Sequence, residues 1–173
     1  GFIYHHQQCC VKWSNSKSSL FSISNGVKQG GVLSPLLFNL YIDVLLHRLA
    51  ASGFGCHIGN VFYGALAYAD DIVLISENAN GLQSMLNVLN DWCCKWRITV
   101  NENKTKVLHF RNRNINRSNV IFKCGEKVID YESDYKYLGF WFNDHLDMKK
   151  CVKEIAKSAS RALSALYMKF LNT

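Results

Sequence analysis

The sequence predicts an α+β fold in which helices pack on one face of an antiparallel sheet. Paired runs of apolar residues, many of them β-branched or aromatic, are separated by short polar corners, as in hairpins. Other stretches carry apolar residues every three or four positions, as in amphipathic helices. With 173 residues, of which 49% are hydrophobic and 13% aromatic, the chain can bury one core of ordinary size. We therefore expect a single globular unit.

The first third of the chain predicts a hairpin, a glycine-rich loop and a buried helix. The runs CCVKWS and LFSIS read as two strands joined by NSKSS. In the loop NGVKQGGVLSP, Ser34 can cap a helix whose first position is the only proline, Pro35. Apolar residues wrap most of the circumference of LLFNLYIDVLLHRLA, which predicts a helix largely buried against a sheet. Gly53 and Gly55 follow it and should end it.

The rest of the chain predicts further hairpins and two more helices. VFYGALAYA and IVLIS should form an antiparallel hairpin whose turn is the acid pair Asp70 and Asp71. Residues 80–96 predict an amphipathic helix, and ITVN and KVLHF predict short strands around the polar corner NENKT. VIFKCGEKVIDY and YKYLGFWF add two extended pieces, and an amphipathic, lysine-rich helix closes the chain.

The acid pair is a poor choice for a tight turn, which prefers Asn-Gly or Asp-Gly. Adjacent carboxylates repel each other, and the apolar residues around Asp70 and Asp71 should leave them only partly hydrated. Such a pair favours a bound cation. The sequence therefore predicts a metal site at this turn.

Charge and cysteine content narrow the class of protein. The net charge of +7 favours an anionic partner, such as a phosphate backbone or acidic lipid. No apolar run reaches the roughly 18 residues of a membrane span, and no signal peptide is evident, so we expect a soluble intracellular protein. The seven cysteines are expected to be reduced and packed. His5, His6, Cys9 and Cys10 could suggest zinc, but no second ligand cluster lies at a finger-like distance.

In chain order, these features resemble a polymerase palm, and the motifs are similar to those of non-LTR (LINE-type) retrotransposon reverse transcriptases. GVKQGGVLSPLLFNLYID matches that family's motif B, AYADDIVL its motif C, TVNENKTKVLHF its motif D and YKYLGFWF its motif E. The resemblance covers roughly residues 9 to 166. It implies a right-hand reverse transcriptase fold, with partial fingers and palm in residues 1–142 and a helix leading to the thumb in residues 143–173.

The resemblance also implies a site for template-directed nucleotidyl transfer. It makes Asp70 a direct ligand of a two-Mg²⁺ centre and Asp71 a supporting one. It makes Lys104 a contact of the nucleotide phosphates and a candidate proton donor to pyrophosphate. The implied partners are an RNA template, a DNA primer, deoxynucleotide triphosphates and the rest of a parent polyprotein, in the nucleus or cytoplasm. The other implied contacts are Gln29 and Gly30 with the nucleotide, and Tyr68, Leu138 and Gly139 with the primer.

The pattern departs from the family in two places. The family's metal site has a third carboxylate in motif A, upstream of motif B, yet no Asp or Glu precedes Gly26. Because the chain also begins with Gly1 rather than Met, we expect a fragment that does not polymerise alone. Arg97 stands where the family usually ends the motif D helix with glycine. A left-handed cap there would strain arginine by about 1 kcal/mol, unless Arg97 adopts a different cap.

Three alternatives remain open at this stage. A group II intron reverse transcriptase and maturase also uses QGG…SPLL and YADD, although KTKVLHF and YLGFWF fit the LINE type better. A non-catalytic RNA-binding remnant would explain the absent third acid together with the excess of basic over acidic residues. A protein-interaction domain with a coincidental acidic turn would require four motifs to occur in order by chance.

Overall fold

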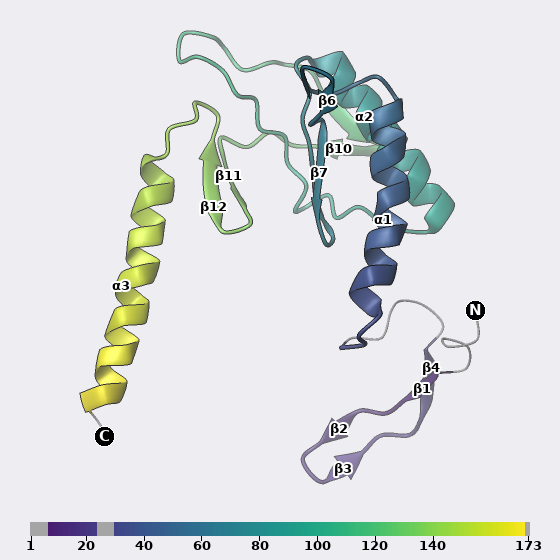
Figure 1. The fold of residues 1–173 in the computed structure, drawn as a ribbon, viewed down its shortest axis with the longest axis vertical. Coiled ribbons are helices and arrows are strands. Elements are labelled where there is room, and N and C mark those ends of the chain that lie inside the picture. Colours follow the sequence, from purple (N-terminus) through teal and green to yellow (C-terminus); the bar gives the residue numbers. More distant parts are fainter. Residues whose placement is uncertain (1–6, 24–29, 172–173) are drawn as a thin grey trace.

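The computed structural model describes residues 7–23 and 30–171. Within these residues the fold is α+β, with three helices and six two-stranded antiparallel sheets (Figure 1). The expected single antiparallel sheet is wrong, because every strand pairs only with its hairpin neighbour. A hairpin needs one short turn, whereas a continuous sheet needs each hairpin to find a partner on a second edge. The helices accordingly pack on each other and on separate hairpins.

The N-terminal hairpin is confirmed, with a tighter turn than expected. Cys9 lies opposite Phe21 and Trp13 opposite Ser16, and the register shifts by one residue between these two paired parts. The turn lies at Ser14, whose φ is 51°. The hairpin projects from the rest of the chain (Figure 1). Its strands are β1 (Gln7–Cys9), β2 (Lys12–Trp13), β3 (Ser16–Lys17) and β4 (Phe21–Ile23).

Helix α1 (Ser34–Ala51) contains Pro35 in its first turn, as predicted. Ser34, however, is the buried first residue of the helix, and the capping position falls on Leu33, whose side chain cannot cap. The expectation that α1 is buried around most of its circumference is also wrong. One face is buried, at Ile42, Leu45 and Leu49. Apolar side chains on the rest of α1 are exposed, namely those of Leu36, Leu37, Leu40 and Val44.

The next run of strands is divided more finely than its sequence suggested. A hairpin of β5 (His57–Ile58) and β6 (Val61–Phe62) precedes the expected one. Gly64 separates β6 from β7 (Ala65–Tyr68), which pairs with β8 (Asp71–Leu74). Glycine is required at Gly64 because an added Cβ would lie 2.9 Å from the Cα of Gly55.

Helix α2 (Ala79–Trp96) is confirmed as the amphipathic helix across the core. It begins after Asn78, whose Oδ1 accepts a hydrogen bond from the N–H of Gly81 at 2.8 Å. Trp92 is 1% exposed and packs edge-on against Tyr41 of α1. This contact joins the two helices at the centre of the core. Other core residues on α2 are Met85, Leu86, Leu89 and Cys93.

The strands predicted at ITVN and KVLHF are wrong. In that segment only Val107 pairs, through one parallel bridge with Tyr131. A lone bridge is not a strand, because no neighbouring backbone extends the ladder. The two extended pieces predicted after this segment are confirmed, and each forms a hairpin of its own. They consist of β9 (Phe122–Cys124) with β10 (Lys127–Ile129), and β11 (Asp134–Tyr137) with β12 (Phe140–Asn143).

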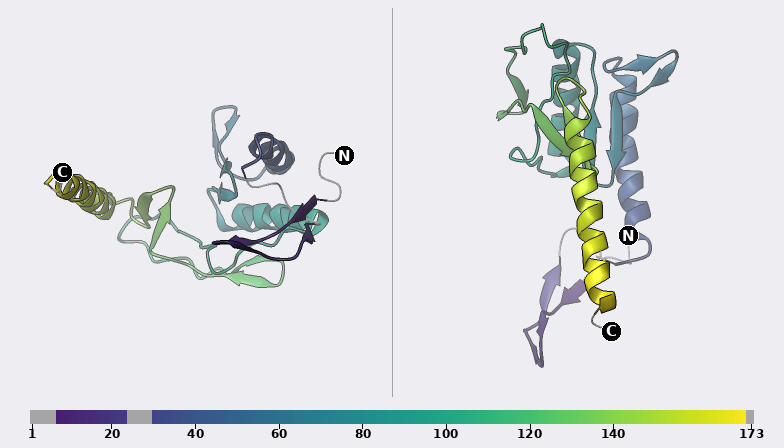
Figure 2. Two further views of the ribbon diagram at one scale, coloured as in Figure 1. Left: turned by 90° about the horizontal axis from the view of Figure 1, so that it is seen from below. Right: turned by 90° about the vertical axis from the view of Figure 1, so that its left-hand side faces the viewer.

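Helix α3 (Lys149–Leu171) is confirmed and extends away from the body of the fold (Figures 1 and 2). Cys151, in its first turn, is 2% exposed. Farther along, its apolar residues face solvent, with Leu163 69% and Leu166 55% exposed. The helix is therefore held at its N-terminal end. None of the helices in the described part of the chain combines the length and apolar character needed to cross a membrane.

Candidate active site around the acidic hairpin

The β7–β8 hairpin presents the two acids at its tip. Tyr68 pairs with Asp71, so the two residues between them, Ala69 and Asp70, form the turn. The expectation that both acids form the turn is therefore wrong by one residue: Asp70 is in the turn and Asp71 begins β8. Ala69 has a φ of 53°, a left-handed conformation that is costly for a residue with a Cβ. A tight, strained turn thus fixes the acids at the end of a short hairpin.

The acids and the neighbouring tyrosine are open to solvent. Asp70 and Asp71 are exposed, and Tyr68 is 67% exposed. The expectation that the pair is only partly hydrated is wrong, because the apolar neighbours lie along the strands and do not cover the turn. Among the described residues neither carboxylate has an ion-pair partner. Both can therefore accept an external cation or substrate group.

The β11–β12 hairpin lies close enough to the acids to feel their charge. Burial raises the pKa of Tyr137, and the negative charge of Asp71 raises it further. Tyr137 pairs with Phe140 across a turn formed by Leu138 and Gly139, which have φ values of 47° and 89°. This is the pair of positive φ angles of a type I′ hairpin turn. Leu138 is 45% exposed, so it is not a core residue.

Lys104 lies on a compact polar corner. Its N–H is 3.2 Å from the carbonyl oxygen of Asn101, and that carbonyl also accepts hydrogen bonds from the N–H and the hydroxyl of Thr105. From β11, the hydroxyl of Tyr135 donates to the carbonyl oxygen of Lys104 at 2.7 Å. The side chain of Lys104 is exposed. The backbone at this corner is thus held from two sides while the ammonium group is left accessible.

The nucleotide contacts expected before α1 are only partly visible. Gly30 is exposed, has a φ of 78° and would have open space around an added Cβ. Positive φ is the conformation for which glycine is favoured. Gln29 lies outside the described residues, as do His5 and His6 of the zinc alternative.

The chemistry of the acid pair suits magnesium as part of a larger site. Mg²⁺ prefers oxygen ligands and is commonly held by one or two carboxylates together with substrate phosphates. Asp70 and Asp71 are accessible carboxylates without competing partners, which fits that donor set. Within residues 7–23 and 30–171, no group of three or more His, Cys, Asp or Glu residues could hold a metal.

The family model described as "Reverse transcriptase (RNA-dependent DNA polymerase)" matches residues 2–142. The chain belongs to this reverse transcriptase family. The match covers the acidic hairpin, the Lys104 corner and the β11–β12 hairpin. The chain is accordingly a segment of an RNA-directed DNA polymerase domain.

The similar curated proteins are retrotransposon products. The Pol polyprotein of the type-2 retrotransposable element R2DM of Drosophila melanogaster is 34% identical over 137 residues, which are 75% of this chain and 13% of the polyprotein. The probable RNA-directed DNA polymerase from transposon BS of the same species is 29% identical over 163 residues, 90% of this chain and 17% of that protein. The polymerase from mobile element jockey of Drosophila funebris is 26% identical over 153 residues, 82% and 16% respectively.

These relatives group the reverse transcriptase segment with the non-LTR retrotransposons, as the motifs implied. The chain spans 13% to 17% of the length of the three relatives.

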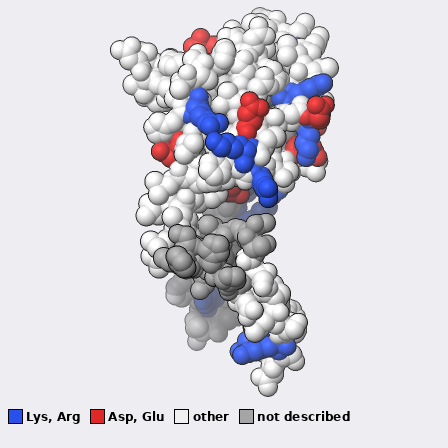
Figure 3. Space-filling model, turned by 90° about the vertical axis from the view of Figure 1, so that its right-hand side faces the viewer, with Lys and Arg blue, Asp and Glu red and all other residues white. Residues whose placement is uncertain are grey.

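Charge is mixed on one face of the segment, where basic and acidic side chains are interspersed among uncharged ones (Figure 3). The lysine and arginine side chains therefore do not form one continuous basic patch on that face.

Sequence reasoning missed three residues of this site, namely Asn101, Tyr135 and Tyr137. Their signals were weak but present. Asn101 stands three residues before Lys104, at the spacing of a side chain that closes a turn. Tyr135 and Tyr137 are two residues apart, so both point to the same face of β11.

Proposed function

We propose that this segment is the palm of a non-LTR reverse transcriptase, with residues 1–142 forming partial fingers and palm and residues 143–173 leading to the thumb. The observation that carries the proposal is the exposed acid pair at the tip of β7–β8, within electrostatic reach of the β11–β12 hairpin. The reaction is the extension of a DNA primer along an RNA template. Its substrates are deoxynucleotide triphosphates, and it takes place inside the cell, in the nucleus or cytoplasm.

Asp70 and Asp71 would hold Mg²⁺ together with a carboxylate from another part of the parent protein. Bound there, Mg²⁺ would stabilise negative charge on the attacking and leaving oxygens. The hairpin contributes rigidity, because the turn at Ala69 and the pairing of Tyr68 with Asp71 fix the direction of both acids. Since the segment provides two of the family's three acids, we expect the 173-residue chain alone not to extend a primer.

The neighbouring residues would bind and orient the substrates. Lys104 would place its ammonium group against the nucleotide phosphates and donate a proton to the leaving pyrophosphate. Gln29 and Gly30 would contact the nucleotide, and glycine allows a close approach of the backbone. Tyr68 would lie beside the primer terminus, and the turn of Leu138 and Gly139 would contact the primer strand. Support for the primer contact is that this apolar turn is exposed rather than buried.

The test uses the full-length protein that contains this segment, assayed for Mg²⁺-dependent primer extension on RNA. Asp70→Asn and Asp71→Asn should each lower the extension rate by about 100-fold or more, because each removes a negative ligand. Asp91→Asn is the matched control, since Asp91 is an exposed carboxylate on α2 and the change in charge is the same. Near-normal extension by Asp70→Asn would overturn the proposal.

A second candidate function is RNA binding without polymerisation, favoured by the net charge of +7 and by the two-acid site. It predicts RNA affinity that falls steeply with salt but no nucleotide incorporation, even by the full-length protein. The same extension assay separates the two functions. Incorporation that depends on Asp70 excludes the binding remnant.

A further inference from the structure

One hydrogen bond connects the Lys104 corner to strand β11, the strand that also carries Tyr137. The hydroxyl of Tyr135 donates to the carbonyl oxygen of Lys104 at 2.7 Å, although the residues are 31 positions apart. The bond reaches the backbone of Lys104 and leaves its ammonium group uninvolved. Tyr135 can therefore set where the lysine is held without neutralising it.

The Lys104 corner has other restraints, but they act differently. The bonds from Lys104 and Thr105 back to Asn101 lie within the corner and fix the shape of its turn. Outside the corner, Glu102 forms an ion pair with Lys127 of β10 at 3.1 Å, but these side chains are 44% and 46% exposed, so the pair holds the corner only weakly. Tyr135 bonds to the main chain of Lys104 and belongs to the regular β11–β12 hairpin, so it restrains the place of the corner relative to that hairpin.

The same strand also carries a residue that feels the charge of the acids. Residues two apart on a strand share a face, so Tyr135 and Tyr137 project to one side of β11. Tyr137 is near enough to Asp71 for its pKa to be raised by that charge. Strand β11 thus bonds to the lysine corner through Tyr135 and lies within electrostatic reach of Asp71 at Tyr137.

We propose that Tyr135 is a positioning residue that holds the Lys104 corner in register with the acidic hairpin during nucleotide addition. The proposal rests on the proposed function, since it gives Lys104 a role at the nucleotide phosphates. Tyr135 itself contacts no substrate. Its hydroxyl acts by fixing the main chain from which the lysine side chain extends.

The first experiment tests the tether without requiring catalysis. In the full-length protein that contains this segment, Tyr135→Phe removes the hydroxyl and keeps the ring. Hydrogen exchange should speed up at the amides of Lys104 and Thr105 by about 5-fold, the factor expected for loss of one ordinary hydrogen bond. The matched control is Tyr131→Phe, because the buried hydroxyl of Tyr131 has no hydrogen-bond partner among the described residues. Unchanged exchange in Tyr135→Phe, or equal acceleration in both variants, would overturn the proposal.

The second experiment uses single-turnover nucleotide incorporation by the full-length protein. Tyr135→Phe should lower the rate at saturating nucleotide about 5-fold while the affinity for primer and template is unchanged. In a Lys104→Ala background, Tyr135→Phe should have no further effect, because the lysine that it positions is gone. If Tyr135 only stabilised the fold, Tyr135→Phe would weaken primer binding as well. The losses of rate from Tyr135→Phe and Lys104→Ala would then be independent and additive.

The outcomes distinguish this inference from the proposed function. Additive effects of the two substitutions, or normal incorporation by Lys104→Ala, would overturn the positioning role of Tyr135. Neither result bears on polymerase activity, which stands or fails with Asp70 and Asp71. Loss of incorporation in Asp70→Asn together with a non-additive Tyr135 and Lys104 pair supports both conclusions.

Discussion

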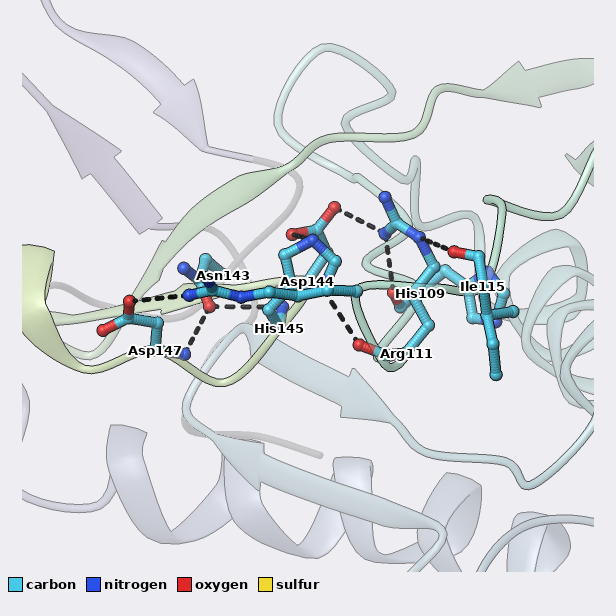
Figure 4. A network of polar contacts seen from close by, with 8 residues as sticks. His109, Arg111, Ile115, Asn143, Asp144, His145 and Asp147 are labelled. Carbon is cyan, nitrogen blue, oxygen red and sulfur yellow. Dashed lines mark hydrogen bonds and ion pairs between the residues drawn. The ribbon is translucent and has the colours of Figure 1, made fainter.

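Arg111 and Asp144 form a largely buried ion pair that fastens the segment after the Lys104 corner to the end of β12. The Nη1 atom of Arg111 lies 2.5 Å from Oδ2 of Asp144, and their side chains are only 16% and 11% exposed. The backbones are joined as well, since the N–H of Arg111 donates to the carbonyl oxygen of Asp144 at 2.8 Å. Nδ1 of His145 lies 2.9 Å from the carbonyl oxygen of Arg111 (Figure 4).

This ion pair lies just before α3. Oδ1 of Asn143 accepts hydrogen bonds from the N–H groups of His145 and Asp147 (Figure 4). Oδ1 of Asp147 in turn accepts one from the N–H of Lys149, the first residue of α3. The network therefore anchors the N-terminal end of a helix whose remaining length projects from the fold. The direction of α3 depends on these contacts.

The ion pair should make stability depend on pH. The hydrogen bond from Arg111, and then its charge and that of His145, hold the pKa of Asp144 below its ordinary value of 3.8. A lowered folded-state pKa gives stability that is complete above the unfolded value and is lost as pH falls through the folded one. Arg111→Gln should lower the free energy of unfolding by roughly 1.5–3 kcal/mol at pH 7. Below the folded-state pKa of Asp144 the difference should shrink.

The measurement is urea unfolding of the 173-residue chain and its variant at pH 7 and at the lowest pH at which both fold. Arg113→Gln is the control, because its pair with Asp147 is 3.5 Å long and Arg113 is 73% exposed. We expect that control to change stability by less than about 0.5 kcal/mol. A loss in Arg111→Gln that does not vary with pH would contradict the assignment to Asp144.

Arg97 ends α2 in the left-handed conformation that the sequence had left undecided. Its φ is 56° and its ψ is 39°, while its N–H caps the helix by bonding to the carbonyl oxygens of Cys93 and Cys94. Glycine adopts this conformation without the clash of a Cβ. Arg97→Gly should therefore raise the free energy of unfolding by about 1 kcal/mol, as measured by denaturant unfolding. Arg97→Ala, which keeps the Cβ, should give no such gain.

The sequence predicted α2, the two C-terminal extended pieces and the reverse transcriptase family because those features depend on local patterns. The period of α2 and the order of the four motifs can be read without knowing any tertiary contact. By contrast, the separate hairpins and the exposed face of α1 depend on which strands and surfaces meet. Tyr135 could not be predicted for the same reason, because its proposed role depends on a hydrogen bond to a residue 31 positions away.

Gly64 should be intolerant of a side chain for a reason other than backbone conformation. An added Cβ would lie 2.4 Å from the ring of Phe62 and 2.9 Å from the Cα of Gly55, and the second contact is with main chain that cannot rotate away. Gly64→Ala should therefore destabilise the chain by about 1–3 kcal/mol. Gly59→Ala is a useful comparison, because Gly59 has a φ of 60° but open space around it. It should cost only about 1 kcal/mol.

Thermal or urea unfolding of both variants tests this difference. If Gly59→Ala proves as destabilising as Gly64→Ala, the close approach at Gly64 is not the cause of its loss.

The cysteines should differ sharply in reactivity. All seven are free thiols, as the sequence predicted, but the expectation that they are packed is wrong for Cys10 and Cys94, which are exposed. Burial, followed by the nearby Cys124 and Cys94, raises the pKa of Cys93 to about 11, whereas its neighbour Cys94 is exposed. Because the thiolate is the nucleophile, iodoacetamide at pH 8 should label Cys94 and leave Cys93 unmodified in the folded chain. Peptide mass spectrometry reads the result, and urea-unfolded chain, in which both cysteines should react, is the control.

Leu138 combines two features that are unfavourable for the stability of the folded chain. It has a φ of 47°, at a turn position where Asn is favoured, and it exposes 45% of an apolar side chain. Leu138→Asn should therefore raise the free energy of unfolding by about 1 kcal/mol. If the exposed leucine contacts the primer strand, the same substitution should weaken primer and template binding by the full-length protein several-fold.

Arg97→Gly separates the two effects, because it relieves the same backbone strain at the end of α2, away from the proposed primer contact. It should stabilise the protein and leave primer affinity unchanged, as measured by fluorescence anisotropy with a labelled duplex. A Leu138→Asn variant that is more stable and binds primer normally would show that the turn does not contact the primer. Weaker binding despite greater stability would instead mean that the strained turn is kept because the leucine side chain reaches the primer strand.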